Sequence, residues 1–179
     1  MDRIIILLAD GFEEIEALAP LDILRRLNYD VKLVSMNDTL QVKSSHNVLF
    51  NADILFNDEI LNSNGVVIPG GMPGATNLRD DHRVISLIQL FNKENKLISA
   101  ICAGPIVLGK ANILINHAAT CYPGFEKELE CKTYLEDKVV ISENIITSRG
   151  PATAFDFSFA IATYLGLDIS KLLKGMLFV

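Results

Sequence analysis

Cys102 is the residue whose type and position most clearly indicate chemistry. It follows the apolar run Leu97–Ile101 and precedes Ala103-Gly104-Pro105, so it stands where a buried strand ends and a helix begins. A turn of this kind lifts a side chain out of the sheet, beside free backbone N–H groups. These groups and the positive end of the helix dipole favour the thiolate, so we expect the pKa of Cys102 to lie below that of a free thiol. The alternative is an unreactive cysteine in the core.

A second stretch, Glu13-Glu14-Ile15-Glu16, follows another predicted strand. Acidic residues in the first turn of a helix interact favourably with its dipole, and helix initiation accounts for Glu13 and Glu14. Glu16 differs because the apolar sequence Ala17-Leu18-Ala19-Pro20 follows it. A carboxyl group in apolar surroundings tends to keep its proton, so Glu16 is a candidate hydrogen-bond donor or proton shuttle.

A third stretch, Gly70-Gly71, also ends a predicted strand. Glycines here permit close approach of the backbone and can direct N–H groups toward an anion. The spacing Gly70-Gly71-x-x-Gly74 is not the dinucleotide-binding fingerprint, and no Lys followed by Ser or Thr completes a phosphate-binding loop. Beside Cys102, one N–H group of this loop and that of Ala103 would form an oxyanion hole.

Alternating strand-like and helix-like segments must position these three stretches. Continuous apolar strands that alternate with helices predict a mainly parallel sheet covered on both faces. In such sheets, sites form beyond the carboxyl ends of the strands, where all three stretches lie. The predicted strands are Arg3–Leu8, Asp30–Ser35, Gly65–Ile68, Leu97–Ile101, Val139–Ile141 and Ile145–Thr147, with a hairpin or edge piece in Gln41–Phe50; the predicted helices are Phe12–Arg26, Arg83–Asn92, Pro105–Ala111, Ala152–Leu165 and Ser170–Leu177.

The composition indicates one globular domain over residues 1–179, with half of its residues hydrophobic and a net charge of −6. Interspersed charges without a long basic run argue against nucleic acid or an anionic membrane as a partner. The apolar run near the start is too short for a signal peptide, and no run is long enough to span a membrane. We therefore expect a cytoplasmic protein.

The cysteines and histidines do not form a second chemical motif. An odd number of widely spaced cysteines, Cys102, Cys121 and Cys131, fits a reducing compartment and is not a disulfide framework. No histidine pair lies near Cys121, which looks like a strand residue, so we predict no metal. The histidines His46, His82 and His117 adjoin none of the strand-end stretches, and a Cys–His dyad is not identifiable from the sequence.

Taken together, these residues resemble the ThiJ/PfpI superfamily, in the branch of the parkinsonism-associated protein deglycase and the bacterial YajL protein. The resemblance runs from Ile4 to about Gly166. It implies a flavodoxin-like three-layer sandwich, shared with class I glutamine amidotransferases, and a homodimer. It rests on five ordered motifs: Ala9-x-Gly11-x-Glu13-Glu14-x-Glu16, Pro20-x-Asp22, Pro69-Gly70-Gly71-x-x-Gly74-Ala75-x-Asn77-Leu78, Ala100-Ile101-Cys102-Ala103-Gly104-Pro105 and Thr147-Ser148-Arg149-Gly150-Pro151.

By this resemblance, Cys102 is the nucleophile and Glu16 is the buried acid bonded to it. The resemblance also implies that Gly71 and Ala103 provide the backbone anion donors, and it places Gly70 in the pocket.

The sequence departs from the family pattern at two positions. Where family members with a proposed catalytic histidine carry it, before a proline, this chain has Tyr122, and a phenol is a poor general base near neutral pH. His46 stands where a family arginine lies near the dimer-side pocket, whereas Arg26 matches the family.

The resemblance implies a cofactor-independent cysteine enzyme acting on a small aldehyde or a glycated substrate, of the glyoxalase or deglycase type, in carbonyl and oxidative stress. The alternative is a redox sensor or chaperone in which Cys102 is oxidised with little turnover, and the absent histidine favours it. An intracellular cysteine peptidase is a third interpretation. The peptidase branch carries a histidine directly after the cysteine, where this chain has Ala103.

Overall fold

A seven-stranded sheet forms the centre of the computed structural model, which describes residues 2–179. Its strand order is β10-β11-β7-β6-β1-β2-β5, and every neighbouring pair is parallel except β10 and β11. This confirms the predicted mainly parallel sheet. The strands are β1 (Arg3–Leu8), β2 (Asp30–Ser35), β5 (Ile54–Leu55), β6 (Gly65–Ile68), β7 (Leu97–Ile101), β10 (Val139–Ser142) and β11 (Ile145–Ser148).

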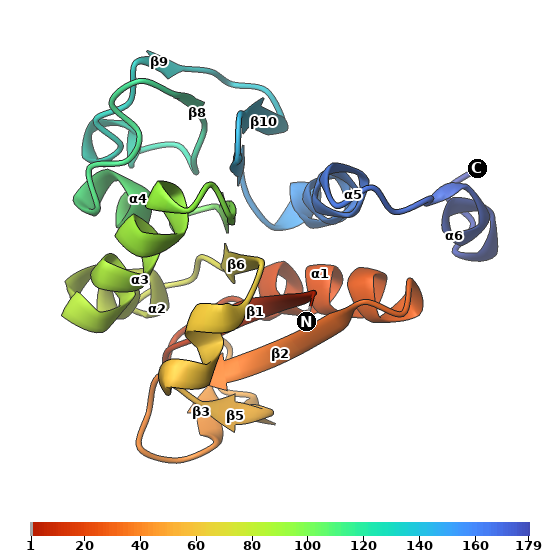
Figure 1. The fold of residues 1–179 in the computed structure, drawn as a ribbon, viewed down its shortest axis with the longest axis horizontal. Helices are drawn as coiled ribbons and strands as arrows, with labels where there is room; N and C mark the ends of the chain where they lie inside the picture. The colour runs from red at the N-terminus through yellow and green to blue at the C-terminus, as the bar shows by residue number, and fades with distance from the viewer. Residues whose placement is uncertain (1) are drawn as a thin grey trace.

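Helices cover both faces of the sheet, which gives three layers (Figure 1). Side chains alternate between the faces of a strand, so Ile5 and Leu7 of β1 pack in one buried cluster whereas Ile4 and Ile6 pack in the other. The first cluster includes α2 (Gly74–Asp80), α3 (His82–Lys93) and α4 (Pro105–Lys110), and the second includes α1 (Glu14–Arg26) and α5 (Ala154–Tyr164), with α6 (Ser170–Gly175) packed against it.

Most predicted elements occur within one or two residues of their expected bounds. Helix α1 begins two residues late because the Glu13 side chain caps it, accepting a hydrogen bond from the Glu16 N–H at 2.8 Å. Gln41–Phe50 does contain a hairpin, made of β3 (Gln41–Lys43) and β4 (Leu49–Asn51). Several short elements were not predicted from the sequence: β5 and α2, the strands β8 (Ala118–Ala119) and β9 (Thr133–Tyr134), and the 3-10 helices η1 (Asp58–Asn62), η2 (Glu126–Glu128) and η3 (Pro151–Thr153).

The prediction that Cys121 is a strand residue is wrong, because β8 ends two residues before it.

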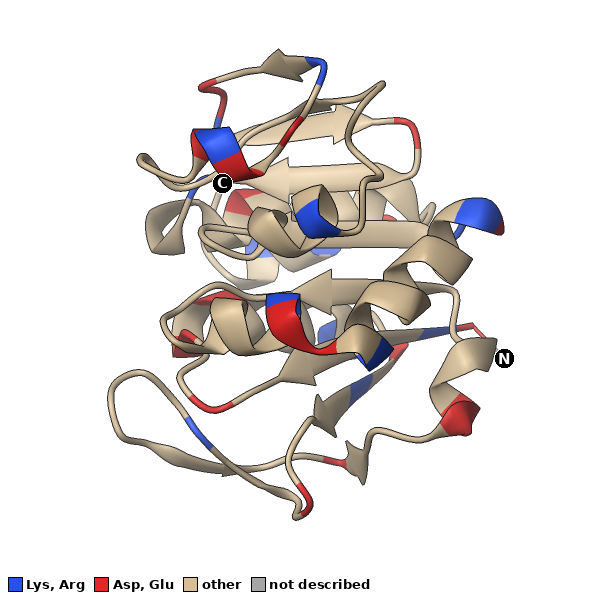
Figure 2. Cartoon of the chain, turned by 90° about the vertical axis from the view of Figure 1, so that its left-hand side faces the viewer, with Lys and Arg blue, Asp and Glu red and all other residues tan. Residues whose placement is uncertain are grey.

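Acidic and basic residues are interspersed along the chain, at helix ends, in loops and on the outer strands (Figure 2). Within residues 2–179, none of the helices is long and apolar enough to cross a membrane.

Candidate active site

The three candidate stretches meet at one edge of the sheet. Strands β1, β6 and β7 are adjacent and parallel, so the loops that follow them leave the sheet on the same side. The loop after β1 leads to Glu13 and Glu16, the loop after β6 contains Gly70 and Gly71, and β7 ends directly before Cys102.

Cys102 occupies a sharp turn between β7 and α4. Its φ of 62° lies in the left-handed region, which is costly for a residue with a side chain and is held by surrounding contacts. Two backbone hydrogen bonds hold it: its N–H donates to Ser148 O at 3.0 Å, and its carbonyl accepts from Tyr122 N–H at 2.9 Å. The predicted strand–turn–helix setting is present, and it leaves the thiol partly exposed.

The glycine pair brings backbone up against the thiol. A Cβ atom on Gly70 would lie 2.7 Å from Cys102 Cβ and 2.7 Å from Glu16 Oε2, so a side chain at this position would push Cys102 and Glu16 out of place. Gly71 has a φ of 85°, which favours glycine. The N–H groups of Gly71 and Ala103 interact with the Cys102 sulfur. The structure thus brings both expected backbone donors to the predicted nucleophile.

Glu16 is the acid beneath this turn. It is 0% exposed, and its Oε2 accepts a hydrogen bond from Gly70 N–H at 2.8 Å. Its Oε1 has no nitrogen or oxygen partner among the described residues, and its carboxyl group interacts with the Cys102 thiol. The apolar sequence after Glu16 therefore did indicate a buried carboxyl group.

Burial controls the protonation of this pair. Burial raises the pKa of Glu16 to about 7, against smaller opposing effects of Cys102 and Gly70 N–H. Burial also raises the pKa of Cys102, and the nearby Glu16 carboxylate raises it further. The expectation of a lowered thiol pKa is therefore wrong, because the N–H groups of Ala103 and Gly71 do not outweigh burial and the carboxylate.

A protonated Glu16 changes this balance, because its negative charge is then absent and its O–H can donate to a thiolate. Because the pKa of Cys102 is raised and that of Glu16 is about 7, a single proton shared by the pair rests on the sulfur, and the ionised Glu16 beside it is the group that can accept it. The arrangement can therefore move a proton between Cys102 and Glu16 while two N–H groups stabilise an anion beside them.

The remaining predicted pocket residues lie at different distances from this pair. Tyr122 borders the site through its N–H, and its half-exposed ring lies against Gly150. Arg26 is in the last turn of α1, about 15 Å along the helix from Glu16; there it pairs with Asp22 at 2.7 Å and lines a separate hollow with Lys171 of α6. The structure does not bring Arg26 to Cys102.

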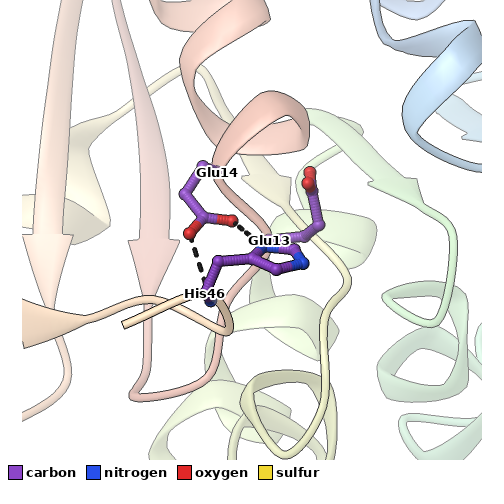
Figure 3. A group of neighbouring side chains, drawn as sticks. All are labelled: Glu13, Glu14 and His46. Carbon is purple, nitrogen blue, oxygen red and sulfur yellow. Dashed lines mark hydrogen bonds and ion pairs between the residues drawn. The ribbon is translucent and has the colours of Figure 1, made fainter. Parts of the chain in front are cut away.

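His46 lies at the exposed tip of the hairpin formed by β3 and β4. Its Nδ1 is 2.7 Å from Glu14 Oε2, and Figure 3 shows the two side chains facing each other beside Glu13. The sequence alone accounts for Glu14 by helix initiation and does not indicate this contact, because nothing in the spacing pairs residue 14 with residue 46.

Glu13, Glu14 and His46 offer three atoms within 4.8 Å of one another that could bind a cation. Both oxygens of Glu14 already accept hydrogen bonds from the hairpin, so we assign no metal to this group.

Comparisons with known proteins agree with the resemblance in the motifs. The DJ-1/PfpI family matches residues 2–164. Protein DJ-1 homolog B of Arabidopsis thaliana is 33% identical over 176 residues, which cover 94% of this chain but only 40% of that relative. The glutathione-independent glyoxalase DJR-1.2 of Caenorhabditis elegans is 34% identical over 163 residues, 90% of this chain and 87% of that protein. The crystal structure of Drosophila melanogaster DJ-1beta is 33% identical, covers 98% of this chain and 97% of its own, and superposes with a TM-score of 0.92. The chain belongs to the DJ-1/PfpI family.

Proposed function

We propose that this protein is a cofactor-independent cysteine enzyme that acts on reactive carbonyls, with conversion of methylglyoxal to lactate as its simplest reaction. The observation that carries the proposal is the buried Glu16 carboxyl beside Cys102, below the N–H groups of Gly71 and Ala103. A relative named as a glutathione-independent glyoxalase supports the same class of reaction. The adducts that glyoxals form on amines and thiols retain the carbon of the former aldehyde group, and they form a second proposed substrate class.

In the proposed mechanism, the thiol proton passes to Glu16 and the Cys102 sulfur bonds to the aldehyde carbon. The former carbonyl oxygen becomes an oxyanion, which the N–H groups of Gly71 and Ala103 stabilise. Glu16 returns its proton to this oxyanion, which gives a neutral hemithioacetal and an ionised carboxylate. The carboxylate then takes the proton from the former aldehyde carbon and delivers it to the neighbouring carbonyl carbon, while the hydroxyl proton passes to the neighbouring oxygen, which leaves a lactoyl thioester. Water hydrolyses the thioester, releases lactate and restores the thiol. The electrons balance within the substrate, so the sequence needs no oxidant.

Lactate formation from methylglyoxal by purified protein tests the proposal. Cys102→Ala should lower the rate by about a thousandfold or more, because it removes the nucleophile. Cys131→Ala is the matched control, since Cys131 is also free and partly exposed, and it should retain the rate. Equal rates in wild type and Cys102→Ala would exclude a cysteine mechanism.

A redox sensor or chaperone is the second candidate function. Tyr122 occupies the position of the family histidine, the His46 ring contacts Glu14 and Ser45, and the His117 ring contacts Ser142. A site without a neighbouring histidine base favours slow turnover. A protonated Glu16 could instead donate a hydrogen bond to an oxidised Cys102.

We also propose a homodimer with the N-terminal helix, from Ile15 to Arg26, near the interface. Ile15 on α1 and Leu49 on β4 are 52% and 62% exposed, and a second copy would cover these apolar side chains. Light scattering at micromolar concentration should give twice the mass of the chain, and Leu49→Asp should shift it toward that of one chain. A wild-type protein with the mass of one chain would contradict the proposal.

A further inference from the structure

The tip of the hairpin formed by β3 and β4 holds the first turn of α1 through Glu14. The Glu14 carboxylate accepts hydrogen bonds from the hydroxyls of Ser44 and Ser45 and from the backbone N–H of His46. The His46 ring adds a fourth at 2.7 Å, and Figure 3 shows both carboxylate oxygens engaged with His46. An ionised carboxylate can only accept, so Nδ1 of His46 carries a proton in this contact.

Backbone bonds reinforce this attachment on the side of α1 that approaches the active site. Gly11 N–H donates to Lys43 O at 2.7 Å, and Ser45 N–H donates to Phe12 O at 2.8 Å. The hairpin therefore binds the whole segment between β1 and α1. Glu14 is the side chain through which it binds the helix itself.

Glu14 directly follows Glu13, one of the two residues that hold Glu16. The Glu13 N–H donates to Gly70 O at 3.0 Å, and the Glu13 carboxylate accepts from Glu16 N–H at 2.8 Å. The Glu16 carboxylate in turn accepts from Gly70 N–H. These bonds link the start of α1 to the loop after β6, so we expect a displacement of Glu14 to change the depth at which Glu16 is buried.

We propose that Glu14 is a positioning residue for Glu16, and that the protonation of His46 tightens its hold. This inference rests on the proposed roles of Cys102 and Glu16. Glu14 acts on Glu16 only through the start of α1, and the tip of the hairpin holds Glu14 in place.

The charges around the pair favour the ion-paired form. Desolvation alone would raise the pKa of Glu14, but the hydrogen bonds from His46 and Ser44 outweigh it and lower this pKa to about 2. The Glu14 hydrogen bond and charge raise the pKa of His46, with a smaller contribution from Glu13. The other charged side chains beside the tip are Asp10 and Lys43. As the pH rises through the raised pKa of His46, its positive charge is lost and only a neutral donor remains for Glu14.

The rate at which iodoacetamide alkylates Cys102, followed by peptide mass spectrometry over pH 5–9, tests the inference without any turnover. In the wild type, the rate should show an inflection near pH 7 from Glu16. Glu14→Gln should lower this inflection by about one pH unit, because a less buried Glu16 ionises more easily. His46→Gln and Ser44→Ala should lower it in the same direction by less, and they carry the test if Glu14→Gln does not fold.

Asp156→Asn is the matched control, since Asp156 is a first-turn acid of α5 that pairs with Lys138 at 3.4 Å, outside the active site. It should leave the inflection in place. An inflection that is present in the wild type and unmoved in the Glu14, His46 and Ser44 variants overturns the inference alone. A wild type that lacks the inflection overturns the proposed Cys102–Glu16 pair and, with it, the inference. A shifted inflection in a protein that forms no lactate upholds the inference and rejects the proposed function.

Discussion

Cys102 follows β7 and Cys121 follows β8, and a backbone hydrogen bond links the two segments, yet the surroundings of the two cysteines differ. The N–H of Tyr122, the residue after Cys121, donates to the Cys102 carbonyl. Cys121 is 0% exposed and packs in the buried cluster that includes α2, α3 and α4, whereas Cys102 is partly exposed on a turn with positive φ. Burial raises the pKa of Cys121 to about 12 and also raises that of Cys102.

The difference lies in what the neighbouring groups can do with a proton. Cys102 interacts with a buried carboxyl group whose pKa of about 7 lets it accept the thiol proton near neutral pH, and with two N–H groups. Cys121 has one backbone N–H, from Phe125, and the charge of Glu126 raises its pKa further. A neighbouring proton acceptor and two N–H groups, rather than a low thiol pKa, mark the reactive cysteine in this protein.

Removing the charge of Glu16 tests the basis of this comparison and has the largest expected effect. The folded pKa of Glu16 lies above its unfolded value, so the folded state binds more protons between pH 4.5 and 7 and loses stability as the pH rises through that interval. Glu16→Gln keeps an acceptor for Gly70 N–H without a charge. Between pH 4 and pH 8, the wild type should therefore lose on the order of 3 kcal/mol more of its free energy of unfolding than Glu16→Gln does.

Urea unfolding at both pH values measures this gain. Asp156→Asn controls for the loss of one surface charge and should show a much smaller change between the two pH values. If Glu16→Gln destabilises the protein equally at both, Glu16 is not a buried acid with a raised pKa.

Mild peroxide should separate the two cysteines by about tenfold or more in rate, because only Cys102 combines exposure with a proton acceptor. Peptide mass spectrometry should find two added oxygens on Cys102 before any on Cys121 or Cys131. Glu16→Gln keeps a donor for the sulfinate whereas Glu16→Asp shortens its reach, so the two variants should differ in how far oxidation proceeds. Equal oxidation of all three cysteines would remove the distinction drawn here.

Tyr122 follows Cys121, and its N–H bonds to the Cys102 carbonyl. Replacing its side chain should have the smallest effect of the changes considered. Because a phenol is a poor base near neutral pH, Tyr122→Phe should leave lactate formation within about twofold of the wild type. Steady-state rates measure this, with Cys102→Ala as the inactive reference. A loss of a hundredfold, the scale of a missing general base, would make Tyr122 part of the catalytic machinery.

Local pattern predicted the parts of the site that depend on neighbours in sequence. The apolar run before Cys102 and the Gly104-Pro105 sequence after it indicated the turn, and the apolar residues after Glu16 indicated its burial. The short elements were missed because two to seven residues carry too little periodicity to distinguish a strand or helix from a loop. Arg26 matched a family position, although the predicted helix Phe12–Arg26 already separates it from Glu16 by ten residues along one helix.

The sequence by itself determined the parallel sheet, the edge at which the three stretches meet, and the residue types present there, because strand periodicity and turn chemistry are local properties. Only the tertiary structure decided the direction of the Cys102 pKa and the attachment of Glu14 to His46. Desolvation and charge act through space and depend on which distant segments close over a group. Residues 16 and 102, like residues 14 and 46, meet only after the chain has folded.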